Sequence, residues 1–320
     1  MTSRPRPHSP ALTVVVPVLD EEECVAELTR RVFDALAAAA VHGEILFVDD
    51  GSRDATPARI AALRAADPRV GAIHFTRSFG HQAALAAGLR FARGDAVVTM
   101  DGDLQHPPEL LPALVAAWRT GADVVHTVRR LPAGEIPGLK ERAARLFYAL
   151  ATRLSDTPIV PRGADFRLLD RRVVDALNAL EEHFVFVRGL VPWLGFPETR
   201  IEYEAQQRFA GHSKYRLRTM LRLAFDGILS FSVLPLRVIS AAGALTALFG
   251  VLFGIFALVA HMMGRVQASG WTSLVVLVLI FGGVQLLSLG VISEYVGRIY
   301  EEVKRRPRYV IDRLEGAEWP

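Results

Sequence analysis

Two carboxylates one residue apart, Asp101 and Asp103, have the type and spacing for metal chemistry. They follow an apolar run, residues 96–100, that predicts a buried strand. In an extended segment residues two apart face the same way, so both carboxylates and Gln105 present oxygen on one side. Such oxygen ligands suit Mg²⁺ or Mn²⁺ bridging a diphosphate. A lone Asp-x-Asp also occurs in ordinary turns, but its place after a strand favours a metal site.

Other polar groups also follow predicted strands. Asp49 and Asp50 end the run at residues 44–48, where a carboxylate can accept hydrogen bonds from a ribose or a nucleobase. They can equally cap the following turn, because Gly51 and Ser52 come next. Four cations lie in loops or at element ends, as a site for several phosphates requires, although each alone is also an ordinary surface charge: Arg77, Arg129, Arg208 and Lys214.

The elements that position these residues alternate between strand and helix. Predicted strands cover residues 12–16, 44–48, 70–75, 96–100, 123–128, 163–169 and 200–204, and predicted helices cover 21–40, 55–66, 82–92 and 109–120. This alternation indicates an α/β fold with a mostly parallel sheet and helices on both faces. Ligands of such sheets bind outside the carboxyl ends of the strands, where the candidate residues fall.

Two long apolar stretches near the C-terminus predict transmembrane helices. They cover residues 236–263 and about 271–293, and each exceeds the ~20 residues needed to cross the hydrocarbon core. Basic residues flank both outer ends, at Arg237 and from Lys304 to Arg308. The positive-inside rule therefore places the N-terminal domain and both termini in the cytoplasm, with the chain multi-pass in the plasma membrane.

Residues around these stretches predict further partners. The basic amphipathic pattern at residues 217–231 indicates either an interfacial helix or an ordinary helix that faces the core. Gly250 and Gly254 permit close helix packing, between the spans or between subunits, and we expect a homo-oligomer. The net charge of only +3 gives no sign of nucleic-acid binding.

Short motifs are spread from about residue 12 to residue 310. They are VVVP (14–17), VDDGSRD (48–54), RSFGHQAA (77–84), DGDLQHPPE (101–109), ADFRL (164–168), RFAGHSKY (208–215) and EYVGRIY (294–300). Together they resemble the GT-A fold of family 2 glycosyltransferases. The combination is most similar to the polyprenyl-phosphate glycosyltransferases, in particular the bacterial two-span members of the dolichol-phosphate mannose synthase group.

The resemblance implies a role for each matching residue. Its implied catalytic residues are Asp101, Asp103, Asp165 and Arg129, with Asp101, Asp103 and Gln105 holding Mg²⁺ or Mn²⁺. Its implied nucleotide- and phosphate-binding residues are Pro17, Asp20, Asp49, Asp50, Arg77, Arg208, Ser213 and Lys214. Three positions depart from the family pattern: Asp20 replaces a common Asn, His81 a frequent Lys and Thr127 a common Gly.

The implied activity is metal-dependent, inverting transfer of a sugar from a UDP- or GDP-linked nucleotide sugar to a polyprenyl phosphate at the cytoplasmic membrane face. The implied organisation is a disordered tail (1–10), a GT-A domain (11–212), an interfacial amphipathic segment (213–233), two transmembrane helices (234–298) and a cytoplasmic tail (299–320). One alternative is a processive polysaccharide synthase, whose Q-x-x-R-W motif residues 206–209 do not match. Another is a non-catalytic, membrane-anchored binding module, against which the intact Asp101/Asp103 pair argues.

Overall fold

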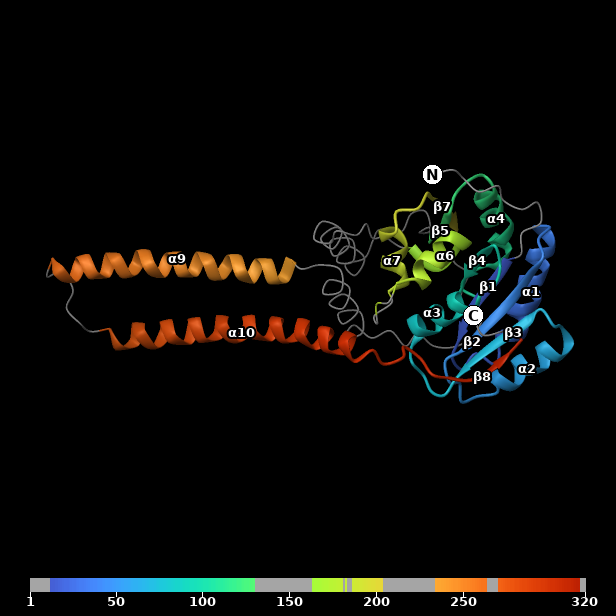
Figure 1. Cartoon of the computed structure of the whole chain (residues 1–320), viewed down its shortest axis with the longest axis horizontal. Helices are drawn as coiled ribbons and strands as arrows, with labels where there is room; N and C mark the ends of the chain where they lie inside the picture. Colours follow the sequence, from blue (N-terminus) through green and yellow to red (C-terminus); the bar gives the residue numbers. More distant parts are fainter. Residues whose placement is uncertain are drawn as a thin grey trace, which may run out of the picture. The chain divides into compact units, whose positions relative to one another are not determined.

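The computed structural model describes residues 12–129, 163–180, 182, 186–203, 234–263 and 270–316. The chain divides into two compact units. The sheet unit holds the described residues up to 203 together with 306–316, and the helical unit holds 234–263 and 270–305 (Figure 1). The predicted interfacial segment, residues 213–233, lies outside the described residues.

The bounds of the elements follow the predicted alternation closely. The strands are β1 (Leu12–Val18), β2 (Gly43–Asp49), β3 (Val70–Phe75), β4 (Ala96–Thr99), β5 (Val124–Arg129), β6 (Gly163–Asp170), β7 (Glu198–Tyr203) and β8 (Ile311–Glu315). The helices are α1 (Val25–Ala38), α2 (Thr56–Ala66), α3 (His81–Phe91), the 3₁₀ turn η1 (Pro108–Leu110), α4 (Leu111–Arg119), α6 (Arg171–Asn178), α7 (Val187–Trp193), α9 (Leu234–Met262) and α10 (Trp271–Lys304).

The eight described strands form one mixed sheet in the order β7-β5-β6-β4-β1-β2-β3-β8. The four central strands β4, β1, β2 and β3 are parallel, as are β5 and β7. β6 runs antiparallel to both of its neighbours, and β8 runs antiparallel to β3. The predicted mostly parallel α/β fold is therefore confirmed.

Helices cover both faces of the central strands. All seven residues of β1 are buried, which suits a parallel strand with helices on both sides. Val14 and Val16 pack into the core formed with α1 and α4. The largest fully buried side chain in this core is Trp118 of α4. On the opposite face α3 lies directly against β1, where Gly88 contacts Val15. The carboxyl ends of β1, β2 and β4 are thus held at one rigid edge.

β8 is an element that the sequence did not predict. It lies within residues 299–320, which the sequence analysis describes only as a tail, and it pairs with the edge strand β3. Its five residues do not alternate in the apolar pattern of a half-buried strand, since Asp312, Arg313 and Glu315 are charged. An edge strand needs little apolar surface, because only one side of its backbone is paired. The chain that leaves the helical unit therefore returns to complete the sheet.

The helical unit contains two helices long and apolar enough to cross a membrane. The qualifying segments are Leu236–Phe256, with mean hydropathy 2.2, and Ile280–Lys304, with mean hydropathy 1.4. Large apolar side chains such as Leu245, Phe249 and Leu286 are exposed along them, which indicates association with a membrane. The 34 residues of α10 extend about 50 Å, more than the ~30 Å hydrocarbon core. Its charged end, from Glu294 onward, therefore continues beyond a bilayer-spanning length.

Substitution of Gly88 tests how closely α3 packs against the sheet. A Cβ atom there would lie 2.1 Å from Val15 Cγ1 and 3.2 Å from Val48 Cγ2. Alanine normally favours a helix interior over glycine by about 0.5–1 kcal/mol. Overpacking against a stiff β-branched side chain costs about 1–3 kcal/mol, so we expect Gly88→Ala to lower the free energy of unfolding by about 1–2 kcal/mol.

Thermal unfolding of the purified full chain in detergent measures this difference. Gly71→Ala is the matched control, because its Cβ would meet its nearest neighbours at 3.4 Å, an ordinary contact. A Gly88→Ala protein as stable as the wild type would contradict the close packing of α3 on β1.

Candidate active site

Many of the polar residues singled out in the sequence line two cavities at the carboxyl ends of the parallel strands. The larger, about 640 Å³, is lined by residues that follow β1, β2 and β3 and by two residues of β8. The smaller, about 300 Å³, is lined by Pro17 of β1, by Asp101 and Asp103 after β4, by His81 of α3 and by Asp165 of β6. Leu19 lines both cavities, so they adjoin.

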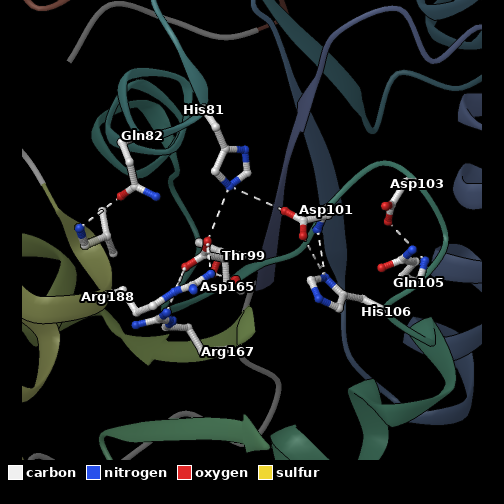
Figure 2. A network of polar contacts seen from close by, with 11 residues as sticks. His81, Gln82, Thr99, Asp101, Asp103, Gln105, His106, Asp165, Arg167 and Arg188 are labelled. Carbon is white, nitrogen blue, oxygen red and sulfur yellow. Dashed lines mark hydrogen bonds and ion pairs between the residues drawn. The ribbon is translucent and has the colours of Figure 1, made fainter. Parts of the chain in front are cut away.

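Asp101 points into the smaller cavity from the end of β4 (Figure 2). Its backbone N–H donates to His106 Nδ1 at 3.0 Å, which anchors the turn that follows. His106 is itself buried and stacks on the ring of Phe166 at 5.3 Å. Within the described structure, Asp101 Oδ1 is buried without a hydrogen-bond partner, although His81 Nε2 lies 3.4 Å away. One oxygen of the Asp101 carboxylate therefore keeps its capacity to accept a ligand.

The segment after Asp101 is a turn and not the extended strand end that the sequence predicts. Leu104 has a left-handed backbone, with φ of 59°, and the Asp103 Oδ1 atom accepts a hydrogen bond from the Gln105 N–H at 3.1 Å. Gly102 is required here, because a Cβ would lie 2.9 Å from Val18 Cγ1. Asp101 and Asp103 still line the same cavity, but Gln105 is not among its lining residues. The turn thus brings the two carboxylates to one cavity by a different geometry.

The buried Asp165 is the centre of an ionic network (Figure 2). Its carboxylate contacts Arg167 at 2.9 Å, Arg188 of α7 at 2.7 Å and His81 Nε2 at 3.5 Å. Its backbone carbonyl also accepts a hydrogen bond from the Thr99 hydroxyl. His81 lies between Asp165 and Asp101, so the network joins β6, α7 and α3 to the end of β4.

The network determines the charge states of its members. Burial alone would raise the pKa of Asp165, but the contact with His81 and the charges of Arg188 and Arg167 hold it well below its usual range. Burial would lower the pKa of His81, but its contact with Asp165 and the charge of Asp101 raise it above its ordinary value. Asp165 is therefore an anion at neutral pH, which makes it a poor general base.

The donor set in the smaller cavity fits a hard divalent cation that is only partly held by protein. Asp101 contributes a carboxylate oxygen without a hydrogen-bond partner, and Asp103 lines the same cavity. Among the described residues, no three His, Cys, Asp or Glu side chains converge as a complete metal site. Mg²⁺ characteristically binds through one or two carboxylates together with substrate phosphates and water, so two carboxylates suffice.

Asp49 and Asp50 have different environments although they are adjacent. Asp50 accepts hydrogen bonds from the Ser78 hydroxyl at 2.7 Å and from the backbone N–H groups of Phe79 and Gly80 at 2.6 and 3.0 Å. It therefore supports the loop before α3, and not the turn of its own segment. Asp49 lines the larger cavity, where Oδ2 contacts His74 Nδ1 at 2.9 Å.

Asp49 is also ionised. Burial would raise the pKa of Asp49, but hydrogen bonds from His74 and Ser52 lower it below its usual value.

Two other predicted nucleotide-binding residues, Asp20 and Arg77, line the larger cavity as well. Asp20 has φ of 57°, and its side chain accepts a hydrogen bond from the Arg53 N–H at 2.8 Å. Arg77 lines the same cavity with its guanidinium group 3.9 Å from the centre of the Phe79 ring.

Several predicted site residues fall elsewhere. Arg208, Ser213 and Lys214 lie outside the described residues. Arg129 ends β5, where its backbone pairs with Tyr203, and its side chain is outside the description. Thr127 fills a buried position and its hydroxyl donates to the Phe166 carbonyl at 2.7 Å.

The sequence analysis missed Arg167 and Arg188 as site residues. Arg167 is two residues from Asp165 on one strand face, a spacing that could have suggested the pair. Arg188 is distant in sequence from every other member, and no spacing connects it with them. Gln82 Oε1 accepts a hydrogen bond from the Val187 N–H at 3.1 Å, which fixes α7 beside α3 and so places Arg188.

Comparison with known proteins identifies the family. Residues 13–177 match Glycosyl transferase family 2, just over half of the chain. The chain belongs to glycosyl transferase family 2. It is therefore a glycosyltransferase, and the family that the motifs resemble is confirmed.

Individual relatives match nearly the whole chain. The glycosyltransferase YkcC of Bacillus subtilis is 42% identical over 306 residues, which are 96% of this chain and 94% of YkcC. The bactoprenol glucosyl transferase of Shigella phage SfII is 40% identical over 302 residues, 94% of this chain and 97% of that enzyme. Among solved structures, glucosyl-3-phosphoglycerate synthase of Mycobacterium tuberculosis in complex with Mn²⁺ and UDP has 21% identity and a TM-score of 0.49, and the match covers 69% of this chain and 76% of that one.

The buried pair of Asp165 and Arg167 predicts a stability change with a defined pH dependence. Asp165→Asn removes the carboxylate that lies 2.9 Å from the buried Arg167, so we expect the free energy of unfolding to fall by about 3 kcal/mol at neutral pH. The folded pKa of Asp165 is depressed, so its stabilisation is complete above the unfolded pKa of about 3.9 and is lost as the pH falls below it.

Unfolding of the wild type and of Asp165→Asn, measured from about pH 2 to pH 8, checks this expectation. The difference between the two should stay constant above about pH 5 and shrink below about pH 4. Asp175→Asn is the control, because its 3.6 Å pair with Arg171 is exposed and worth little. A difference that declines between pH 6 and pH 8 would contradict the ionised state of Asp165.

Proposed function

We propose that this family 2 enzyme transfers a sugar from a nucleotide sugar to a polyprenyl phosphate at the cytoplasmic face of the membrane. The observation that carries the proposal is the smaller cavity, where Asp101 and Asp103 adjoin the ionised network of Asp165, His81 and Arg188. The bactoprenol glucosyl transferase relative supports the lipid acceptor, and the two apolar helices support its membrane location.

The two adjoining cavities suggest how the donor is divided between them. The larger cavity, with Asp49 on its wall, suits the nucleoside, because a carboxylate can accept hydrogen bonds from ribose hydroxyls. The smaller cavity suits the diphosphate and the sugar. Asp101 and Asp103 would hold Mg²⁺ or Mn²⁺ here, with Gln105, which does not line this cavity, as the third ligand that the resemblance implies. The cation would supply positive charge to offset that of the departing diphosphate.

The reaction that fits this site is a direct displacement. An oxygen of the lipid phosphate attacks the anomeric carbon, the bond from that carbon to the nucleoside diphosphate breaks, and the sugar is inverted. A phosphate monoester has a second pKa near 6 and is largely ionised at pH 7, so the nucleophile needs little help from a base. This agrees with an Asp165 that is already ionised and paired. Catalysis then comes mainly from positioning and electrostatics.

Asp165 in this proposal is a positioning residue. It holds the imidazole of His81 and the guanidinium of Arg188 at the cavity wall, where anionic phosphates must approach. Binding of the acceptor phosphate by Arg129, Arg208, Ser213 and Lys214 remains a prediction from the resemblance, as do the choice between UDP and GDP and the homo-oligomer.

The activity can be tested with membranes that contain the full chain. Incubation with a panel of labelled UDP- and GDP-sugars and a polyprenyl phosphate should yield a label that is extractable with lipid. We expect EDTA to abolish the product and Mg²⁺ or Mn²⁺ to restore it. Asp101→Asn and Asp103→Asn should each lower the rate by about 10²-fold or more, on the scale of lost transition-state electrostatics.

The control for these variants is Asp34→Asn, an exposed carboxylate on α1 that pairs with Arg30. It should leave the rate of lipid-linked product formation unchanged. Full activity of the wild type in EDTA would exclude the metal role, and label that is never extracted with lipid would exclude the acceptor.

Membrane topology provides a separate prediction. Basic residues flank both outer ends of the two apolar helices, so both termini should be cytoplasmic and face the supply of nucleotide sugars. A reporter protein that is active only in the cytoplasm should therefore be active when it is fused after residue 320. A C-terminal reporter that is active on the outer side would overturn the proposed orientation.

A further inference from the structure

The strand β8 brings residues from beyond the apolar helices to the wall of the larger cavity. Asp312 and Arg313 of β8 line that cavity together with residues that follow β2 and β3. β8 is therefore more than a cover for the edge of the sheet, because it contributes two side chains to the wall of this cavity.

Strand register places Arg313 in one row with Asp49. Asp49 pairs with His74 across β2 and β3, and His74 pairs with Arg313 across β3 and β8. Directly paired residues on neighbouring strands point to the same face of a sheet. The row therefore runs from the Asp49 carboxylate through the buried His74 to the Arg313 guanidinium at the outer edge.

Contacts on both sides of the row hold it in place. His74 contacts Asp49 Oδ2 through Nδ1 at 2.9 Å, and its Nε2 lies 3.6 Å from Glu315 of β8. Arg313 pairs with the same Glu315 at 3.2 Å while about half of its side chain, 52%, remains exposed. A half-exposed ion pair on one strand is weak and is readily rearranged, so Arg313 can contact a ligand in the cavity.

The segment that leads into β8 is firmly attached to the sheet unit. Tyr309 stacks on Phe75 with ring centres 5.0 Å apart, and the Thr76 N–H donates to the Val310 carbonyl at 3.1 Å. Arg308 donates to the Leu180 carbonyl at 2.9 Å. These contacts hold the backbone that carries Arg313 in place before any ligand arrives, so only its side chain has to be ordered on binding.

We propose that Arg313 is a nucleobase-binding residue and that β8 forms the outer wall of the nucleotide site. This inference rests on the proposed function. Asp49 and Arg313 are two strand spacings apart, about 10 Å, a span on the scale of a nucleoside. Asp49 accepts hydrogen bonds from the ribose, and Arg313 donates to the carbonyl oxygens or ring nitrogens at the edge of the base.

The charges around Arg313 favour a base over a phosphate. Three carboxylates, those of Asp49, Asp312 and Glu315, lie in or beside the same row. They would repel a phosphate group, whereas a neutral base with acceptor atoms at its edge avoids that cost. The diphosphate is better accommodated in the adjoining cavity beside Asp101.

Binding of three probes to the purified full chain tests the proposal. The probes are UDP, GDP and inorganic pyrophosphate, each titrated in the presence of Mg²⁺ or Mn²⁺. Arg313→Ala should weaken the better-binding nucleoside diphosphate by about tenfold or more, as expected for the loss of a charge-assisted hydrogen bond. Binding of pyrophosphate should not change. In the transfer assay the variant should raise KM for the nucleotide sugar and leave kcat nearly unchanged.

Two further variants make the result specific. Arg313→Gln keeps length and some hydrogen-bonding capacity, so it should restore part of the affinity. Arg306→Ala removes an exposed arginine of the same segment that does not line the cavity, and it should bind all probes as the wild type does.

Each contrary outcome has a distinct meaning. Equal weakening of pyrophosphate and nucleotide would place Arg313 at the phosphates and overturn the base assignment. Unchanged nucleotide binding in Arg313→Ala would also overturn it, while the proposed transfer activity would stand. A folded wild type that binds neither UDP nor GDP would overturn the proposed function together with this inference.

Discussion

The buried carboxylate of Asp165 imposes a constraint that the rest of the site satisfies. An ionised group away from water is tolerated only when cations surround it, and here they come from β6, α7 and α3. Each cation is in turn fixed by its own element, as when Gln82 accepts a hydrogen bond from the first N–H of α7. Meeting this electrostatic requirement therefore determines how three elements, distant in sequence, pack around the end of β4.

The same need to balance negative charge explains why a divalent cation suits the smaller cavity. Five carboxylates line it: Glu21, Asp50, Asp101, Asp103 and Asp165. Asp50 is satisfied by the loop before α3, and Asp165 by its cations. Asp101 keeps a carboxylate oxygen without a hydrogen-bond partner in the described structure, and it lies beside Asp103. A diphosphate brings further negative charge to this point, which a divalent ion offsets.

Sequence reasoning succeeded where a pattern is local. The strand-then-acid arrangement of residues 96–103 and the alternation of elements predicted the sheet and the edge at which Asp49 and Asp101 lie. It failed where tertiary packing brings together segments that are distant in the sequence. Arg188 joins the site through α7, and β8 pairs with β3 across 235 intervening residues (Phe75 to Ile311), so neither had a local signal. Sequence reasoning also missed the turn at Leu104, because the spacing of two acids indicates chemistry but not backbone geometry.

The position of β8 in the chain sets an order of events during synthesis. β3 is made early, whereas β8 follows both α9 and α10. Until β8 arrives, β3 exposes an unpaired edge that can join other strands. Domains fold largely as they emerge from the ribosome, so the sheet unit forms first with this edge open. Its last described strand arrives only after both apolar helices have been translated, which makes completion of the sheet a late step that follows the synthesis of those helices.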